Sequence, residues 1–127
     1  MSVTGKDFHE FAQKCMSYDD EISYRNAIGR AYYGLYHEVC SALHNCPATS
    51  HTGVATYLQD EAWRGNEPYE KFAMKSLGIV LQQQHSKRKQ CDYQIDLNVT
   101  KEDALESMKV TEKMLIKLQS MLVPKTA

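Results

Sequence analysis

The sequence is poor in several features that would narrow its function at once. Its 127 residues include three prolines, one tryptophan and three phenylalanines, and the formal net charge is only −1. Proteins that bind nucleic acid through bulk electrostatics are usually much more basic, so any contact with nucleic acid must be local. No run of 18 apolar residues occurs, which argues against a membrane span. The composition, 43% hydrophobic and 24% charged, is that of an ordinary globular protein.

Export signals and metal motifs are also missing. The first ten residues, MSVTGKDFHE, contain no apolar stretch of the kind found in signal peptides, so we expect an unexported, cytoplasmic protein. The four cysteines include no Cys-x-x-Cys pair, and scattered thiols in such a chain are usually unreactive. His44, Cys46 and His51 form the one cluster of metal-binding side chains, but their spacing matches no zinc pattern. We therefore expect no metal and no other cofactor.

The scarcity of proline leaves long segments free to form helices. Apolar residues recur at helical spacing, and no segment has the two-residue period of a strand. The candidate N-caps are Ser17, Asp19 or Asp20 for the longest helix, Ser50 for the next, and Thr100, in a capping arrangement with Asp103, for the last. Polar residues 85–98 interrupt the pattern and predict an irregular connection. The sequence therefore predicts one all-α domain over residues 1–127, an up-and-down bundle of four to five helices. The expected helices span residues 7–17, 20–45, 51–63, from Pro68 to about 84, and from 101 to about 122.

The predicted helix 20–45 has a polar side opposite a buried side. At roughly 100° per residue, Tyr32 and Tyr36 fall on the apolar side. Gly34 lies on the polar side, where it costs about 1 kcal/mol relative to alanine but leaves space for a ligand or a second backbone. A cation and an imidazole about two turns apart suit a phosphodiester, although an ordinary solvated face would have the same pattern. The polar line consists of Asn26, Arg30, His37, Ser41 and His44.

Three separated motifs together resemble the HEPN family, the higher eukaryote and prokaryote nucleotide-binding domains. The segment RAYYGLYH at 30–37 resembles the family's pattern of Arg, small residue, Tyr-Tyr, small residue, any residue, aromatic and His. The segment SHTGVATYL at 50–58 resembles the start of the family's next helix, and RKQCDY at 88–93 resembles its Arg-x-x-Ala-Asp-Tyr. The resemblance covers about residues 20 to 120.

The resemblance implies a small helical bundle that is commonly dimeric. Many members are metal-independent ribonucleases of toxin or defence systems that use an Arg-x4-6-His motif, and Arg30 and His37 have six residues between them. In active members, two such motifs face each other across a dimer cleft. We therefore expect Arg30 and His37 to be catalytic, RNA to be the substrate, and a homodimer to form the site. An antitoxin or nucleotidyltransferase would be the partner protein.

Other residues would then contact the substrate. Asn26, Ser41 and His44 could position the RNA backbone, and Tyr33 could stack on a base or pack at an interface. Lys87 and Arg88 could extend a phosphate track or be plain surface.

The sequence also departs from the best-known toxin branch, whose motif lies nearer the C-terminus and has a tyrosine after the histidine. The family includes non-catalytic modules as well, which act as adaptors or as partners of nucleotidyltransferases. In that alternative, Arg30 would pair with an acid such as Asp92 and His37 would pack at a dimer seam.

Overall fold

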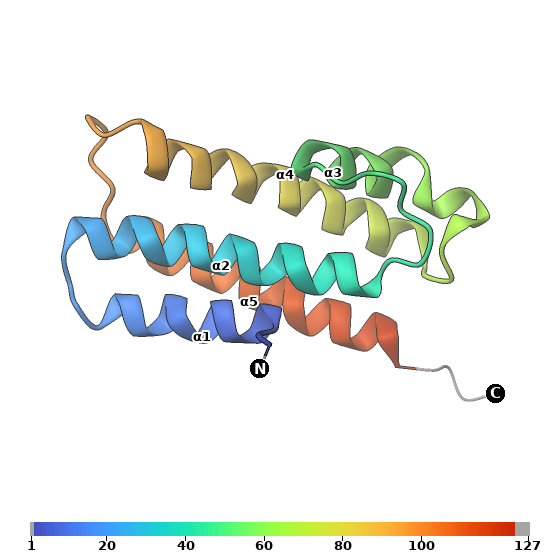
Figure 1. The fold of residues 1–127 in the computed structure, drawn as a ribbon, viewed down its shortest axis with the longest axis horizontal. Coiled ribbons are helices and arrows are strands. Elements are labelled where there is room, and N and C mark those ends of the chain that lie inside the picture. The colour runs from blue at the N-terminus through green and yellow to red at the C-terminus, as the bar shows by residue number, and fades with distance from the viewer. Residues whose placement is uncertain (1, 124–127) are drawn as a thin grey trace.

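The computed structural model describes residues 2–123, and within them the chain is helical with no strand. The four long helices, α1, α2, α4 and α5, alternate in direction along the chain, so each runs opposite to the long helix before it (Figure 1). The sequence-based prediction of an all-α bundle is confirmed. No helix in the described part of the chain is long and apolar enough to cross a membrane. The elements in chain order are α1 (Gly5–Met16), α2 (Glu21–Ala42), α3 (His51–Asp60), the π-helical turn η1 (Ala62–Asn66), α4 (Lys71–Tyr93) and α5 (Lys101–Leu122).

Helix α2 is the central element of the bundle. It packs against α1, α4 and α5, while the short α3 lies on α4 (Figure 1). One group of buried side chains joins α2 to α3, α4 and the second half of α5. A second group joins α1 and the first half of α2 to the end of α4, the α4–α5 connection and the first half of α5. The largest of these side chains is Tyr32, with 1% of its surface exposed.

Predicted N-caps of three helices are confirmed, and of the three candidates for α2 the cap is Asp20, while Ser17 ends α1. The Asp20 carboxylate accepts a hydrogen bond from the Ser23 amide at 2.9 Å, and the Ser50 hydroxyl accepts one from the Gly53 amide at 3.0 Å. Thr100 forms a capping box with the helix residue three positions later, as the sequence predicts. These local hydrogen bonds satisfy amide groups that have no partner within the helix. They fix where α2, α3 and α5 begin.

Boundaries between α2 and α4 differ from the prediction. Helix α2 ends at Ala42 rather than residue 45, because the Glu67 carboxylate accepts the amides of His44 and Asn45 at 2.7 and 2.8 Å. Helix α3 ends at Asp60 rather than 63 and is followed by the π-helical turn, which contains Gly65 at a φ of 90°. Helix α4 begins at Lys71 under a Glu70 cap, so Pro68 lies before it rather than in its first turn.

The segment 85–98 does contain an irregular connection, as predicted, but the connection begins only after Tyr93, because α4 continues to that residue. Residues 79–93 contain neither glycine nor proline, and Lys, Arg and Gln are good helix formers. Hydrophobic periodicity does not detect this part of the helix because its inward positions include the polar Gln84, which is only 2% exposed. Only residues 94–100 connect α4 to α5.

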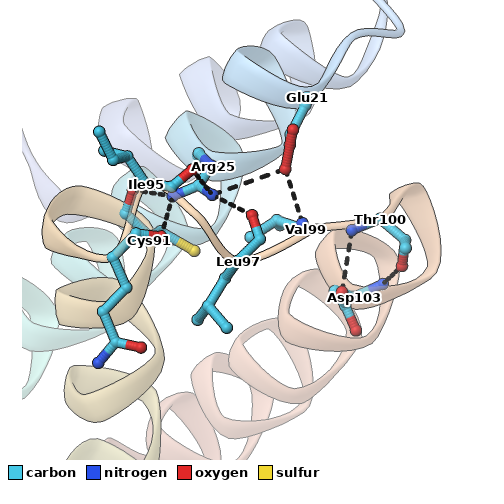
Figure 2. A network of polar contacts seen from close by, with 9 residues as sticks. Glu21, Arg25, Cys91, Ile95, Leu97, Val99, Thr100 and Asp103 are labelled. Atoms are coloured by element: carbon cyan, nitrogen blue, oxygen red, sulfur yellow. Dashed lines mark hydrogen bonds and ion pairs between the residues drawn. The ribbon is translucent and has the colours of Figure 1, made fainter.

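A buried arginine that the sequence analysis did not single out holds this connection. Arg25 on α2 is 7% exposed and donates hydrogen bonds to the carbonyls of Cys91 and Leu97 at 2.8 and 2.5 Å (Figure 2). It also donates to the carbonyls of Gln94 and Ile95. These contacts satisfy carbonyl groups at the end of α4. The predicted pairing of Arg30 with Asp92 is wrong: Asp92 pairs with Arg88 on its own helix, with 2.9 Å between Nε and Oδ2.

Candidate active site

Tyr33, in the middle of α2, is the centre of a cluster that contains both predicted catalytic residues. The guanidinium carbon of Arg30 lies 5.1 Å from the Tyr33 ring centroid, and that of Arg88 lies 5.0 Å from it. The His37 ring is stacked at 6.1 Å from Tyr33. Arg88 comes from the part of α4 that was predicted to be irregular. The fold therefore places two permanent cations and an imidazole around one aromatic ring.

Arg30 is half-buried and makes no ion pair with any residue between 2 and 123. Its side chain lies close enough to Cys15 on α1 to lower the pKa of that thiol, although burial of the thiol has the larger, opposite effect. Arg88 is also half-buried but shares its charge with Asp92. Since Arg30 has no carboxylate partner, its guanidinium keeps its donors for an incoming anion.

His37 is exposed to solvent at the edge of the same cluster. The centroid of its ring lies 5.1 Å from that of Phe8 on α1 and 5.6 Å from that of Tyr36. With Ser41, it lines a surface cleft of about 720 Å³ between the start of α1 and the second half of α2. Solvent can therefore reach this imidazole, and the predicted substrate-binding residue Ser41 lines the same cleft.

Two histidines that were not predicted as site residues complete the cluster. His51, the first residue of α3, lies 4.2 Å from the Tyr36 ring and 4.8 Å from the stacked ring of His85 on α4. Its Nδ1 is 2.7 Å from the hydroxyl of Tyr32. His85 could have been found from the sequence, because it precedes Arg88 by three residues on one helix and residues at that spacing are neighbours.

The surroundings of His51 and His85 favour the neutral form of each imidazole more strongly than water does. Burial lowers the pKa of His51, and the nearby Arg88 guanidinium and His37 lower it further. Burial also lowers the pKa of His85, with added effects from His51, Lys89 and Arg88. Burial raises the pKa of the Tyr36 phenol to about 12 and raises that of Tyr32 as well. The cluster thus combines fixed positive charge with imidazoles that are uncharged near neutral pH.

Three predicted substrate contacts lie away from this cluster. The side-chain amide of Asn26 donates to the Ile22 carbonyl of its own helix, and Asn26 lines a separate pocket with Arg25. His44 follows the end of α2, so it does not share the polar line of that helix, and its ring lies against Tyr69. Lys87 lines another groove, near the start of α5. It lies away from the cluster because its side chain points about 100° around the helix from that of its neighbour Arg88.

The predicted open space at Gly34 does not exist, because α1 fills it. A methyl group built on Gly34 would lie 2.8 Å from the carbonyl oxygen of Gly5 and 3.1 Å from the amide nitrogen of His9. A second backbone does approach Gly34, as expected, but it belongs to the same chain. The glycine therefore allows α1 and α2 to pack closely and does not provide a surface for a ligand or a second copy.

No group of three or more metal-binding side chains comes together in the described residues. Comparison with family models found no match, and comparisons with curated proteins and solved structures found no significant one. The resemblance to HEPN domains therefore rests on the three sequence motifs alone.

Proposed function

We propose that the chain is a metal-independent endoribonuclease of HEPN type, toxin-like or defence-like, in which Arg30 and His37 are catalytic. The observation that carries the proposal is the position of Arg30, Arg88 and the exposed His37 around the ring of Tyr33. These groups match what cleavage of a phosphodiester requires. The positive charge stabilises the phosphorane, and an imidazole transfers a proton near neutral pH.

The reaction would use the ribose 2′-hydroxyl as the nucleophile. Arg30 would bind the non-bridging phosphate oxygens with its planar set of donors, and Arg88 would add charge from the other helix. Tyr33 lies beside both guanidiniums and would contact the nucleotide whose phosphate they hold. Attack of the 2′-oxygen on phosphorus would release the 5′-oxygen of the next nucleotide and leave a 2′,3′-cyclic phosphate. Because arginine and histidine supply both the charge and the proton transfer, cleavage should persist in EDTA.

We propose that the chain forms a homodimer, because of the family resemblance and the exposed position of His37. Gly34 does not support a dimer, because α1 of the same chain covers it. Two copies related by a two-fold axis could bring their His37 sides together. Light scattering at tens of micromolar protein should show a dimer. A monomer at every salt concentration would count against a site shared by two copies.

The test of the function is cleavage of RNA by matched arginine variants. Arg30→Ala should lower the rate of total-RNA cleavage by at least about 100-fold, the low end for loss of a catalytic group. Arg64→Ala is the control, because that exposed arginine lies in η1, where its guanidinium contacts the Trp63 ring and no residue of the candidate site. The control should cleave at the wild-type rate. A non-catalytic adaptor would leave RNA intact in every case and instead retain a second protein in a pull-down.

A further inference from the structure

His51 is held in one orientation by residues from two helices. It begins α3 under the Ser50 cap, and its ring lies against Tyr36 at 4.2 Å and against His85 at 4.8 Å. The Tyr32 hydroxyl is 2.7 Å from Nδ1. Tyr32 is almost fully buried, so it cannot follow a moving imidazole. A ring fixed in this way is arranged for a defined proton transfer rather than for general surface solvation.

The hydrogen bond to Tyr32 determines which nitrogen of His51 is free. Nδ1 is occupied, whereas Nε2 makes no hydrogen bond to any residue in the range 2–123. When Nδ1 carries the proton and donates it to the Tyr32 oxygen, the lone pair of Nε2 can accept a proton from a substrate. Burial raises the pKa of the Tyr32 phenol, so the hydroxyl stays protonated and available as a partner.

His51 and His37 lie against the same two tyrosines. The centroid of the Tyr36 ring lies 4.2 Å from that of His51 and 5.6 Å from that of His37. The centroid of the Tyr33 ring lies 5.6 Å from that of His51 and 6.1 Å from that of His37. Both guanidiniums of the candidate site also lie at Tyr33. A phosphate held by those guanidiniums would therefore have one imidazole from α2 and another from α3 beside it, both from one chain.

We infer that His51 is the general base of the proposed cleavage and that His37 is the general acid. The inference rests on the proposed function. Nε2 of His51 takes the proton of the 2′-hydroxyl while the 2′-oxygen bonds to phosphorus. The bond from phosphorus to the 5′-oxygen breaks, and that oxygen takes a proton from the His37 imidazolium. The products are a 2′,3′-cyclic phosphate and a 5′-hydroxyl, and exchange with water restores both histidines.

The charged and titratable groups that face His51 favour the role of base. They are Tyr32, Tyr33, Tyr36 and His37 from α2, and His85 and Arg88 from α4. No carboxylate is among them, so no negative charge stabilises the imidazolium, and the neutral form of the ring is favoured before reaction. Tyr32 and His85 act as positioning residues, because they hold His51 without touching the substrate. A dimer would then join two complete acid–base sets rather than two halves.

The test uses an RNA oligonucleotide containing a site that the wild-type protein cleaves, and a second version with sulfur in place of the leaving 5′-oxygen. A thiolate is a far better leaving group than an alkoxide and needs no proton, so loss of the acid becomes harmless while loss of the base does not. His51→Gln should lower the cleavage rate at least about 100-fold on both oligonucleotides. His37→Ala should be impaired on the oxygen version and close to wild type on the sulfur version.

Tyr32→Phe is the second variant, and it keeps the ring that fills the core. It should reduce kcat about tenfold on both oligonucleotides with little change in KM, as expected for a residue that orients the base. Wild-type rates for both His51→Gln and Tyr32→Phe, with His37→Ala inactive, would overturn the role of His51 and leave the proposed function intact. A His51→Gln defect that disappears with the sulfur leaving group would also overturn the assignment, since His51 would then be the acid. Failure of the wild-type protein to cleave any RNA would remove both proposals.

Discussion

Replacing Gly34 with alanine should weaken the packing of α1 on α2, whereas the same change at Gly29, on the same helix, should stabilise the protein. At position 34 the new methyl carbon would lie 2.8 Å from a backbone oxygen of α1 and 3.1 Å from a backbone nitrogen. At position 29 the nearest atom would be the flexible Arg88 Cγ at 3.7 Å, an ordinary contact distance. The two substitutions are therefore identical in chemistry and differ in the space that each finds.

The magnitude follows from two opposing effects. Glycine to alanine inside a helix gains about 0.5–1 kcal/mol, through helix propensity and the lower entropy of the unfolded chain. At Gly34 the backbone of α1 must move aside, and such overpacking costs about 1–3 kcal/mol. We expect Gly29→Ala to raise the free energy of unfolding by about 0.5–1 kcal/mol. Gly34→Ala should lie about 1–3 kcal/mol below it.

Urea unfolding followed by far-UV circular dichroism measures both free energies, provided that the two variants keep the wild-type denaturant dependence. The comparison also bears on the candidate site, because α1 carries Phe8, which contacts His37 at 5.1 Å. Equal stabilisation by the two alanines would refute the close packing of α1 on Gly34. The face of α2 around Gly34 would then be open enough to accept a ligand or a second copy of the chain.

Three further outcomes follow from the contacts described. Arg25→Met should lower the free energy of unfolding by about 3 kcal/mol or more, because four carbonyl groups lose a charged donor. A loss under about 1 kcal/mol in urea unfolding would contradict that role. Tyr32→Ala should cost about 3–5 kcal/mol, whereas the exposed His37→Ala should change stability by less than about 0.5 kcal/mol; equal losses by calorimetry would make His37 a core residue. Since the pKa values of His51 and His85 are lowered in the folded state, the unfolded chain binds protons first as the pH falls, so stability should be complete above about pH 6.5 and decline below it. His85→Gln should reduce that decline in unfolding measured against pH, and an unchanged slope would argue against the buried, neutral imidazole.

The order and type of the helices were predictable because they depend on local chemistry. Asp20, Ser50 and Thr100 cap helices through hydrogen bonds that span three residues, so their pattern is visible in the sequence. The extension of α4 was not predictable from apolar spacing, since Gln84 is buried where an apolar residue would be expected. The end of α2 depends on Glu67, which lies more than twenty residues away in the sequence.

Apart from Arg88 on α4, which was predicted as a phosphate contact, the candidate site was predictable only within α2. Arg30, Tyr33 and His37 share α2, so helical spacing alone places them together. His51 and His85 join them through the packing of α3 and α4, which no periodicity within one segment reveals. At Gly34 the sequence shows the cost of a glycine inside a helix, but it does not show that α1 packs against that glycine. Arg25 pairs with Glu21 one turn earlier on α2, which helical spacing could reveal, but its four carbonyl partners lie more than sixty residues away in the sequence and could not be predicted.

The central claim is that this chain cleaves RNA with the imidazole of His37 and without a metal ion. The most direct measurement incubates the wild-type protein and His37→Ala with total RNA in EDTA, and identifies the ends of the products. We predict cleavage by the wild type that leaves 2′,3′-cyclic phosphate ends, and at least about 100-fold slower cleavage by the variant. Equal background cleavage by the two proteins, or activity of the wild type that EDTA abolishes, would contradict the account.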